Sequence, residues 1–266
     1  MTSKLSLQDL SVLLVEPSLA QSRIIADRLR QVGVENVEIA ADGGQALEFM
    51  RAHVPDLVLS AMYFEDMTGT ELIGAMREDE RLGNVPFMLV SSERHDDLLQ
   101  PIRQAGVLAI LPKPFEIDEL KKALYASLDY MAPDPLELPD MNAEDLRVLV
   151  VDDSRFSLNH IVHLLQQMGI EQIWQARDGR EAAEAIRDRQ FDLVITDFHM
   201  PEMDGEQLTH YIRQLSEQPD VPVLMITSEQ DRTRLASVQQ AGVSALIDKP
   251  FDVATIRNLL QRLLST

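Results

Sequence analysis

The sequence lacks cysteine and has few aromatic residues, and these shortages exclude several classes of site. Without cysteine there can be no disulfide framework and no thiolate metal centre. Aromatic side chains make up 5% of the 266 residues, whereas hydrophobic residues as a whole make up 45%. The apolar residues are therefore mostly aliphatic, which favours helices packed on a sheet. The length favours two domains over one.

Positive charge is also scarce. The chain has 24 Lys and Arg against 44 Asp and Glu, which gives a net charge of −20. Both halves are acidic, and no basic tract interrupts them. Because attraction to a nucleic-acid backbone needs clustered Lys and Arg, we expect no direct binding to nucleic acid. Anionic membrane surfaces are disfavoured for the same reason.

Long apolar runs are missing as well. No window approaches the roughly 18 apolar residues that a membrane-spanning helix needs. The N-terminus does not resemble a signal peptide, because Asp9 and Glu16 flank its only apolar run and no basic segment precedes it. We therefore expect a cytoplasmic protein that does not contact the membrane.

An internal repeat organises the chain. A shift of 136 residues aligns six segments of the first half with the second half without a gap, the longest being 55–69 with 191–205. The repeat is too long for a solenoid unit, so each copy is predicted to be an independent domain. We expect a first domain over 1–128 and a second over 146–266, joined by a linker over 129–145.

The linker has an unusual composition. It contains three prolines, six acidic residues and no basic residue. Because proline favours extended geometry and like charges repel, the segment is predicted to be a semi-rigid spacer. The alternative, an extension of the last helix of the first copy, fails at Pro133.

Strand and helix patterns alternate within each copy. In the second copy, strands are expected at 148–151, 173–176, 193–195, 221–227 and 244–247. A helix follows each strand, and the last helix is expected at 252–264. Five strands alternating with five helices predict a parallel sheet covered on both faces. Each copy is therefore predicted to be a flavodoxin-like (βα)5 doubly wound α/β domain with strand order 2-1-3-4-5.

Chemically active side chains follow four of the five strands of the second copy. In chain order, these side chains are Asp152, Asp153, Asp197, Thr227 and Lys249. The carboxyl ends of parallel strands meet at one edge of a sheet, so we expect all five side chains to lie together there. A single acid at a strand end is usually solvated, and a pair of acids often caps a helix. The prediction therefore depends on the presence of all five residues at the ends of neighbouring strands.

The three acidic side chains of this set point to a metal ion. Carboxylates that lie close together repel and raise one another's pKa, and a hard divalent cation such as Mg²⁺ relieves the repulsion. We expect Asp153 and Asp197 to be direct ligands, with Asp152 binding directly or through water. The backbone carbonyl of His199 is a further candidate ligand, whereas its side chain is expected to lie in a loop.

The same set suits phosphoryl transfer. An ionised aspartate can attack phosphorus and form an aspartyl phosphate, and Asp197 is the predicted nucleophile. The metal ion and Lys249 would neutralise charge on the phosphoryl oxygens. The hydroxyl of Thr227 would donate a hydrogen bond to one of these oxygens once the group is attached.

These motifs carry a resemblance to a known family. The second copy resembles the receiver domain of two-component response regulators, through 150–154, 191–205 and 249–251. The resemblance implies phosphotransfer to Asp197 from a histidine kinase or a phosphotransfer protein. It also implies that Thr227 and Lys249 sense the phosphoryl group and alter the face made by the fourth helix, fifth strand and fifth helix. One position departs from the family, because Leu246 stands where receivers commonly carry an aromatic residue.

The first copy keeps the scaffold and lacks the chemistry. The residues aligned with the five-residue set are Glu16, Pro17, Ala61, Ser91 and Lys113. A methyl side chain cannot accept phosphate and proline supplies no side-chain ligand, so the first copy resembles a pseudo-receiver. Glu16 and Lys113 can still form an ion pair.

A small apolar group lies close to the inactive site of the first copy. Its members are Met62, Tyr63, Phe64 and Met67. Exposed aromatic and methionine side chains favour contact with a partner protein. We nevertheless expect this group to pack locally within its own domain.

Three functions fit these observations. The favoured one is a response regulator whose phosphorylation gates binding to a protein partner, since we identify no DNA-binding, cyclase, phosphodiesterase or methylesterase segment. No enzymatic activity is expected beyond phosphorylation and dephosphorylation of the chain itself. The alternatives are a phosphate sink or relay intermediate, and a scaffold that acts without phosphorylation. Two mechanisms stay open for the favoured function: a homodimer through the second copy, or a changed arrangement of the two copies.

Overall fold

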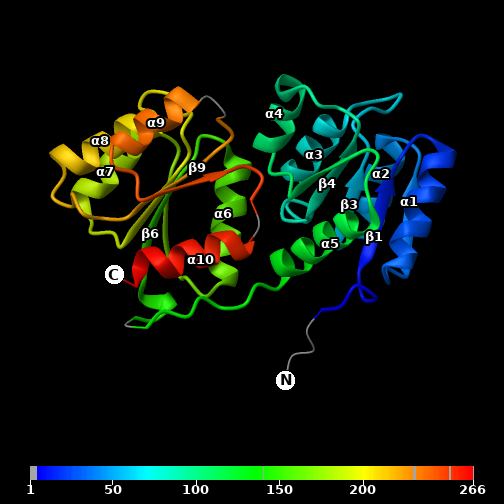
Figure 1. Ribbon diagram of the computed structural model, residues 1–266, viewed down its shortest axis with the longest axis horizontal. Coiled ribbons are helices and arrows are strands. Elements are labelled where there is room, and N and C mark those ends of the chain that lie inside the picture. The colour runs from blue at the N-terminus through cyan, green and yellow to red at the C-terminus, as the bar shows by residue number, and fades with distance from the viewer. Residues whose placement is uncertain (1–4, 140, 230–231, 252, 266) are drawn as a thin grey trace. The chain divides into compact units, whose positions relative to one another are not determined.

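The computed structural model describes residues 5–139, 141–229, 232–251 and 253–265. The chain divides into two compact units, the first unit Met1–Pro133 and the second unit Asp134–Thr266. Each unit contains one five-stranded parallel sheet with helices on both of its faces (Figure 1). The doubly wound α/β fold predicted from the repeat is confirmed in both units.

The first unit alternates strands and helices without interruption. Its strands are β1 (Ser11–Val15), β2 (Asn36–Ala40), β3 (Leu57–Ser60), β4 (Phe87–Ser91) and β5 (Ala109–Pro112). Its helices are α1 (Leu19–Gln31), α2 (Gly43–Ala52), α3 (Gly69–Glu78), α4 (Asp96–Gln104) and α5 (Ile117–Met131). The strands are ordered β2-β1-β3-β4-β5, as the sequence predicts.

The second unit repeats this order after a short 3-10 turn at Ala143–Asp145. Its strands are β6 (Arg147–Val151), β7 (Gln172–Ala176), β8 (Leu193–Thr196), β9 (Val223–Thr227) and β10 (Ala245–Asp248). Its helices are α6 (Arg155–Gln167), α7 (Gly179–Asp188), α8 (Gly205–Leu215), α9 (Arg232–Gln240) and α10 (Val253–Leu264). The order β7-β6-β8-β9-β10 again matches the prediction. Residue 252, the predicted first residue of the last helix, lies outside the described residues.

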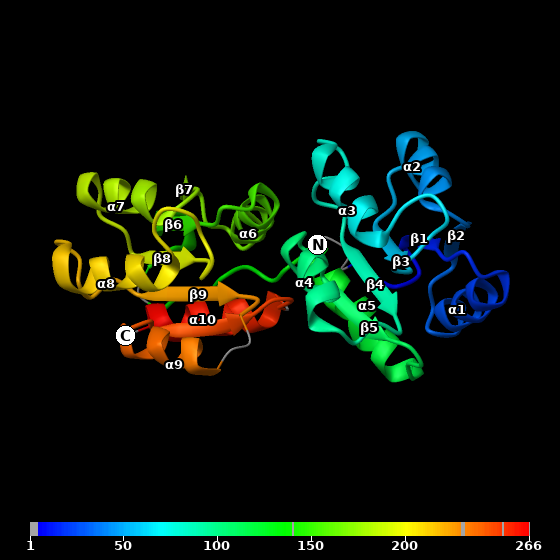
Figure 2. The ribbon, with the colours of Figure 1, turned by 90° about the horizontal axis from the view of Figure 1, so that it is seen from above.

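Burial along the strands explains why the sheets have this order. Every residue of β8 and β9 is buried, whereas the edge strand β7 is partly exposed. A central strand covered on both faces is mostly apolar, which accounts for the continuous aliphatic runs. Figure 2 shows each sheet from a second direction, again with helices on either side.

The strand register brings the predicted site together. Val151 at the end of β6 pairs with Thr196 at the end of β8, so Asp152 and Asp197 leave neighbouring strands at the same height. On the other side of β8, Thr227 of β9 pairs with Asp248 of β10, directly before Lys249. The carboxyl edge of this sheet therefore collects residues that are far apart in the sequence.

Part of the predicted linker packs against the second unit. Helix α5 continues to Met131, inside the segment predicted as linker. Beyond it, the amide of Leu136 donates to the carbonyl of Met168 at 2.9 Å, and the Leu136 side chain is buried. Asp134 pairs with Arg257 of α10 at 3.1 Å. These contacts attach residues 134–136 to the second unit, while the domain boundaries at 128 and 146 stay predictions.

No helix in the described part of the chain is long and apolar enough to cross a membrane.

Candidate functional site

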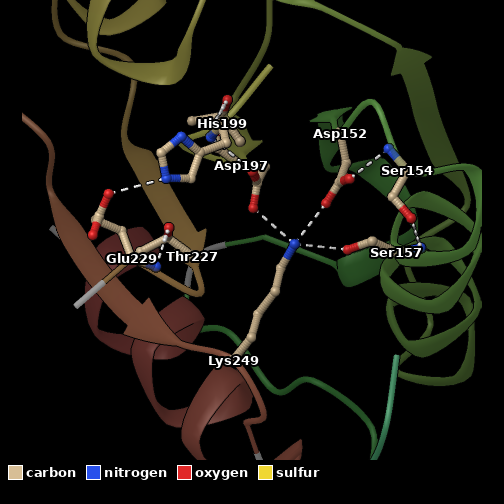
Figure 3. A network of polar contacts seen from close by, with 9 residues as sticks. Asp152, Ser154, Ser157, Asp197, His199, Thr227, Glu229 and Lys249 are labelled. Carbon is tan, nitrogen blue, oxygen red and sulfur yellow. Dashed lines mark hydrogen bonds and ion pairs between the residues drawn. The ribbon is translucent and has the colours of Figure 1, made fainter. Parts of the chain in front are cut away.

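Lys249 forms the centre of a buried polar cluster at the carboxyl edge of the second sheet (Figure 3). Its Nζ lies 2.7 Å from Oδ1 of Asp197 and 2.9 Å from Oδ2 of Asp152. The same Nζ lies 2.9 Å from the hydroxyl of Ser157, which belongs to the first turn of α6. Three of the five side chains predicted to converge are thus in direct contact.

Backbone hydrogen bonds fix where these side chains begin. The amide of Asp197 donates to the carbonyl of Val151 at 2.8 Å, and the amide of Lys249 donates to the carbonyl of Thr227 at 2.7 Å. Each bond continues the sheet one residue past the end of its strand. The site residues therefore stand on the rigid sheet rather than on a free loop.

Gly205 allows the loop after Asp197 to turn back against the strand end. Its amide donates to the carbonyl of Phe198 at 2.9 Å. A Cβ atom at this position would collide with the carbonyl oxygen of Asp197. Only glycine permits so close an approach of the two backbones, which explains the glycine that ends the sequence motif.

Thr227 and Asp153 lie at the edge of the cluster. The hydroxyl of Thr227 accepts a hydrogen bond from the amide of Glu229 at 3.0 Å, so its own O–H stays available to donate. Asp153 is exposed at the start of α6. Among the described residues, no hydrogen bond joins either side chain to Lys249.

His199 connects two loops at the mouth of the site. Its amide donates to Oδ2 of Asp197 at 2.8 Å, which fixes the second oxygen of that carboxylate. Its ring nitrogen Nε2 lies 3.0 Å from Oε2 of Glu229, and the ring turns away from Asp152 and Lys249 (Figure 3). Glu229 also pairs with Arg234 at 3.0 Å.

Sequence reasoning missed Ser157 and Glu229. A serine in the first turn of a helix indicates only a helix start, so nothing in the sequence turns Ser157 toward a lysine. Glu229 stands two residues after Thr227, just as His199 stands two residues after Asp197. Because Thr196 pairs with Met225, the two strands are not in register at this offset, and the sequence alone does not predict the contact of His199 with Glu229.

The cluster perturbs the acidity of its members. Burial raises the pKa of Asp197, an effect that the neighbouring charge of Lys249 opposes and that of Asp152 reinforces. Burial and the charge of Asp152 also raise the pKa of Asp153. Burial alone would lower the pKa of Lys249, but the two carboxylates outweigh it and raise the pKa. The lysine therefore stays cationic beside carboxylates that carry excess negative charge.

The donor atoms fit Mg²⁺ by their chemistry. Asp152, Asp153 and Asp197 supply hard carboxylate oxygens, which are the ligands that Mg²⁺ prefers. In the described part of the chain, no three acidic, histidine or cysteine side chains are gathered as a metal-ligand set. The ammonium group of Lys249 lies between two of the carboxylates, while Asp153 is exposed.

The first unit carries a reduced form of the same cluster. Lys113 lies 2.6 Å from Oε2 of Glu16, which confirms the pair predicted from the aligned sequence. Ala61 occupies the place of Asp197 and is buried. The hydroxyl of Ser91 accepts from the amide of Glu93 at 3.0 Å, as Thr227 does in the second unit.

The apolar group beside Ala61 is mainly part of the core. Met62 is buried, and Phe64 and Met67 pack against the main core of the first unit. Tyr63 differs, because it is 53% exposed and its hydroxyl lies 3.3 Å from Oε2 of Glu93. Local packing is thus confirmed for three of these side chains and is wrong for Tyr63.

Comparison with known families assigns both units to one family. The model of the response regulator receiver domain matches residues 12–125 and residues 148–261. The chain belongs to the response regulator receiver domain family. The predicted family and fold are thereby confirmed, with one receiver in each unit, and the chain is a protein of two-component signalling.

Individual relatives of these receivers come from bacterial signalling proteins. The chemotaxis protein CheY-3 of Vibrio cholerae serotype O1 is 36% identical over 120 residues, which are 45% of this chain and 92% of CheY-3. The histidine-protein kinase BarA of Escherichia coli K12 is 29% identical over 177 residues, which are 66% of this chain and 19% of BarA. The solved structure of CheY4 of Vibrio cholerae is 34% identical with a TM-score of 0.42, over 45% of this chain and 98% of CheY4.

One residue of the second receiver departs from the family pattern. Leu246 stands three residues before Lys249, where the resemblance leads us to expect an aromatic side chain. It is partly buried and packs against a small core cluster of Phe198, Met225 and Val238. In the first receiver, Ile110 holds the corresponding place and also packs against the core. Both receivers thus use an aliphatic side chain at this position.

Proposed function

We propose that the second unit accepts a phosphoryl group on Asp197 and that this modification changes its binding to a protein partner. The observation that carries the proposal is the contact of Lys249 with both Asp197 and Asp152 at the carboxyl edge of a receiver sheet. The phosphodonor would be a histidine kinase or a histidine phosphotransfer protein, the partners expected for this family.

Each residue of the cluster has a role in the proposed reaction. The carboxylate of Asp197 forms a bond to phosphorus as the bond from phosphorus to the donor histidine nitrogen breaks. Lys249 holds one carboxylate oxygen of Asp197 and would neutralise charge on the transferring group. The hydroxyl of Thr227 would donate to a phosphoryl oxygen once the group is attached.

Mg²⁺ is the proposed cofactor of this reaction. Asp152, Asp153, Asp197 and the backbone carbonyl of His199 would hold it, directly or through water. When bound, the ion would supply charge neutralisation for the phosphoryl oxygens. Three carboxylate groups at the carboxyl edge of the sheet, two of them in contact with Lys249, support a hard cation in addition to the lysine.

The proposed output is binding to another protein. The net charge of −20 disfavours nucleic acid and anionic membranes as targets. We propose no catalytic activity on other substrates, only phosphorylation and dephosphorylation of Asp197. The first unit would serve as a pseudo-receiver, because Ala61 offers no oxygen to phosphorus.

Beryllofluoride with Mg²⁺, a mimic of the phosphoryl group, tests the proposal on the full chain. We expect amide resonances around Asp197, Thr227 and Lys249 to shift, while those around Ala61 stay in place. The Asp197→Asn variant should lose the response. Shifts centred on Ala61, or no response in either unit, would overturn the proposal.

A partner-capture experiment separates the proposed switch from its alternatives. The full chain is used as bait in extracts of its own cells, with and without beryllofluoride and Mg²⁺. A partner retained only in one state supports the switch. A short-lived aspartyl phosphate with unchanged partner affinity would favour a phosphate sink or relay. Partner binding that survives Asp197→Asn in every state would favour a scaffold.

A further inference from the structure

A pocket in the first unit lies beside its inactive site. It has a volume of about 370 Å³ and is lined by α1 and by the residues that follow β5. Ile25 and Phe115 are 1% and 5% exposed and form its buried apolar part, while Ile24 and Pro114 are exposed at its rim. The size falls within the range of about 300 to 1,000 Å³ that small-molecule sites occupy.

Two cationic side chains line the same pocket. Lys113 is paired with the buried carboxylate of Glu16. The guanidinium of Arg28 lies 5.0 Å from the centre of the Phe115 ring and donates one hydrogen bond to the Phe115 carbonyl. Arginine has further N–H groups in a planar fork, so Arg28 can still donate to another acceptor. The charges of Lys113 and Arg28 exceed that of Glu16 by one, so the pocket carries a single positive charge in a chain whose net charge is −20.

The second unit does not have this combination of side chains. Leu164 stands in place of Arg28 and is fully buried. His160 stands in place of Ile24, and its ring packs edge-on against Phe251 with ring centres 5.8 Å apart. Lys249 there contacts two carboxylates and a hydroxyl, whereas Lys113 contacts one carboxylate. The side chains that make the pocket of the first unit cationic and apolar are thus replaced at the aligned positions of the second unit.

We propose that this pocket binds a small amphipathic molecule with one carboxylate group. Ile24 and Pro114, which are exposed at the rim, would contact its apolar body, and Arg28 with Lys113 would bind its carboxylate. The planar fork of arginine matches a carboxylate in a bidentate arrangement. The single net charge favours a monoanion over a phosphate dianion. This site goes beyond the proposed phosphorylation and does not depend on Asp197.

Titration of the full chain with 4-phenylbutyrate and octanoate tests the proposal, followed by NMR of isoleucine methyl groups. We expect saturable shifts of Ile24 and Ile25 for at least one acid, with a dissociation constant of about 1 mM or below. The matching neutral amides should bind about tenfold more weakly, because they lose the charge-assisted hydrogen bonds. Inorganic phosphate should not compete.

Two variants of α1 separate the pocket from general charge effects. Arg28→Leu installs the residue of the second unit and should abolish the preference for the acid over its amide. Arg23→Leu removes the same charge from an exposed position of α1 that does not line the pocket, and should bind as the parent chain does. Unfolding curves of both variants establish that the first unit is folded.

Several outcomes would overturn the carboxylate site. These are the absence of saturable shifts with both acids, equal affinity for acid and amide, competition by inorganic phosphate, or an unchanged acid preference in folded Arg28→Leu. The Asp197→Asn variant should bind 4-phenylbutyrate as the parent chain does. A failure of the phosphorylation proposal can thus be told apart from a failure of this one.

Discussion

The two units share the same backbone hydrogen bonds at their strand ends but carry different side chains there. The amide of Ala61 donates to Val15 at 2.8 Å in the first unit, and the amide of Asp197 donates to Val151 at 2.8 Å in the second. The amide of Lys113 donates a hydrogen bond to the carbonyl of Ser91, just as the amide of Lys249 donates to the carbonyl of Thr227. Removing the acceptor carboxylate has therefore left the hydrogen bonds of the strand ends unchanged.

The difference between the units lies in what surrounds the lysine. Lys249 contacts Asp152, Asp197 and Ser157, whereas Lys113 contacts Glu16 alone. The second unit thus holds more negative charge than its lysine can balance, and the first unit holds a balanced pair. Excess negative charge at a buried site attracts a metal ion, and it costs stability in the absence of such an ion.

Removal of the acceptor should have the largest effect on this comparison. We expect Asp197→Asn to abolish phosphorylation, because the amide nitrogen that replaces one oxygen is a poor nucleophile. The matched variant Ala61→Asn should leave phosphorylation unchanged. Mass spectrometry of the full chain after incubation with acetyl phosphate and Mg²⁺ measures both. A phosphoryl group that persists in Asp197→Asn would assign the acceptor elsewhere.

Removal of the lysine should affect the second unit more than the first. Lys249→Met leaves two buried carboxylates without their cation, and we expect a loss of about 3 kcal/mol in the unfolding free energy of the second unit at neutral pH. Lys113→Met leaves only one buried carboxylate, that of Glu16, without its cation, and should cost less than Lys249→Met.

Urea unfolding followed by NMR resolves the two units in the same sample. Mg²⁺ should recover part of the loss in Lys249→Met, because a cation can again neutralise the carboxylates. It should have no effect on Lys113→Met. Equal losses in the two units would mean that the second cluster carries no excess charge.

Much of the fold and of the site could be predicted because strand ends are readable from the sequence. The buried runs of β8 and β9 are aliphatic up to a final threonine, so the change from aliphatic to polar residues marks their ends, and Asp197 follows directly in one case. The repeat then places Glu16 beside Lys113 by alignment. One boundary moved for a physical reason: β9 begins at Val223 rather than 221, since Pro222 has no amide hydrogen to donate.

Contacts that depend on side-chain direction could not be predicted. Ser157 reaches Lys249 because of the rotation of α6 about its axis, which the sequence fixes only through the packing of the helix. Leu136 is one apolar residue in an acidic, proline-rich segment, and its composition gives no sign that it packs on the second unit. The exposure of Tyr63 likewise depends on which way a loop side chain turns.

A third test uses the glycine that begins the helix after the site loop in each unit, Gly69 in the first unit and Gly205 in the second. A Cβ at Gly205 would collide with the carbonyl of Asp197, and one at Gly69 would lie 2.7 Å from that of Ala61. We expect Gly205→Ala to destabilise the second unit by about 2 kcal/mol through overpacking. Gly69→Ala should destabilise the first unit by less.

Gly74 provides the control for these substitutions, because it lies within α3 with open space around its Cβ position. Gly74→Ala should stabilise the first unit by about 0.5 to 1 kcal/mol. Of the three, only Gly205→Ala should slow phosphorylation, since it displaces Asp197. Normal phosphorylation in folded Gly205→Ala would show that the close approach of the two backbones is not needed to position the acceptor.

The smallest expected effect concerns the opposite, amino-terminal edge of the sheets, where the units differ by one ion pair. Arg147 pairs with Asp192 at 2.8 Å, whereas Ser11 in the first unit offers Asp56 only its backbone amide. The hydrogen bond from the Arg147 side chain is the main cause that lowers the pKa of Asp192. A lowered pKa stabilises the fold above the unfolded pKa of about 3.9, and the gain is lost as pH falls through the folded value.

Arg147→Ser installs the residue of the first unit and should cost the second unit about 0.5 kcal/mol at pH 7, because the pair is partly exposed. The difference between parent and variant should shrink as pH falls from about 4 through the lowered pKa of Asp192, below which Asp192 is protonated in both. Urea unfolding of the second unit at a series of pH values measures it. A difference that stays the same in acid would mean that Arg147 stabilises the sheet edge by packing of its side chain, and that the charge of Asp192 has no part in it.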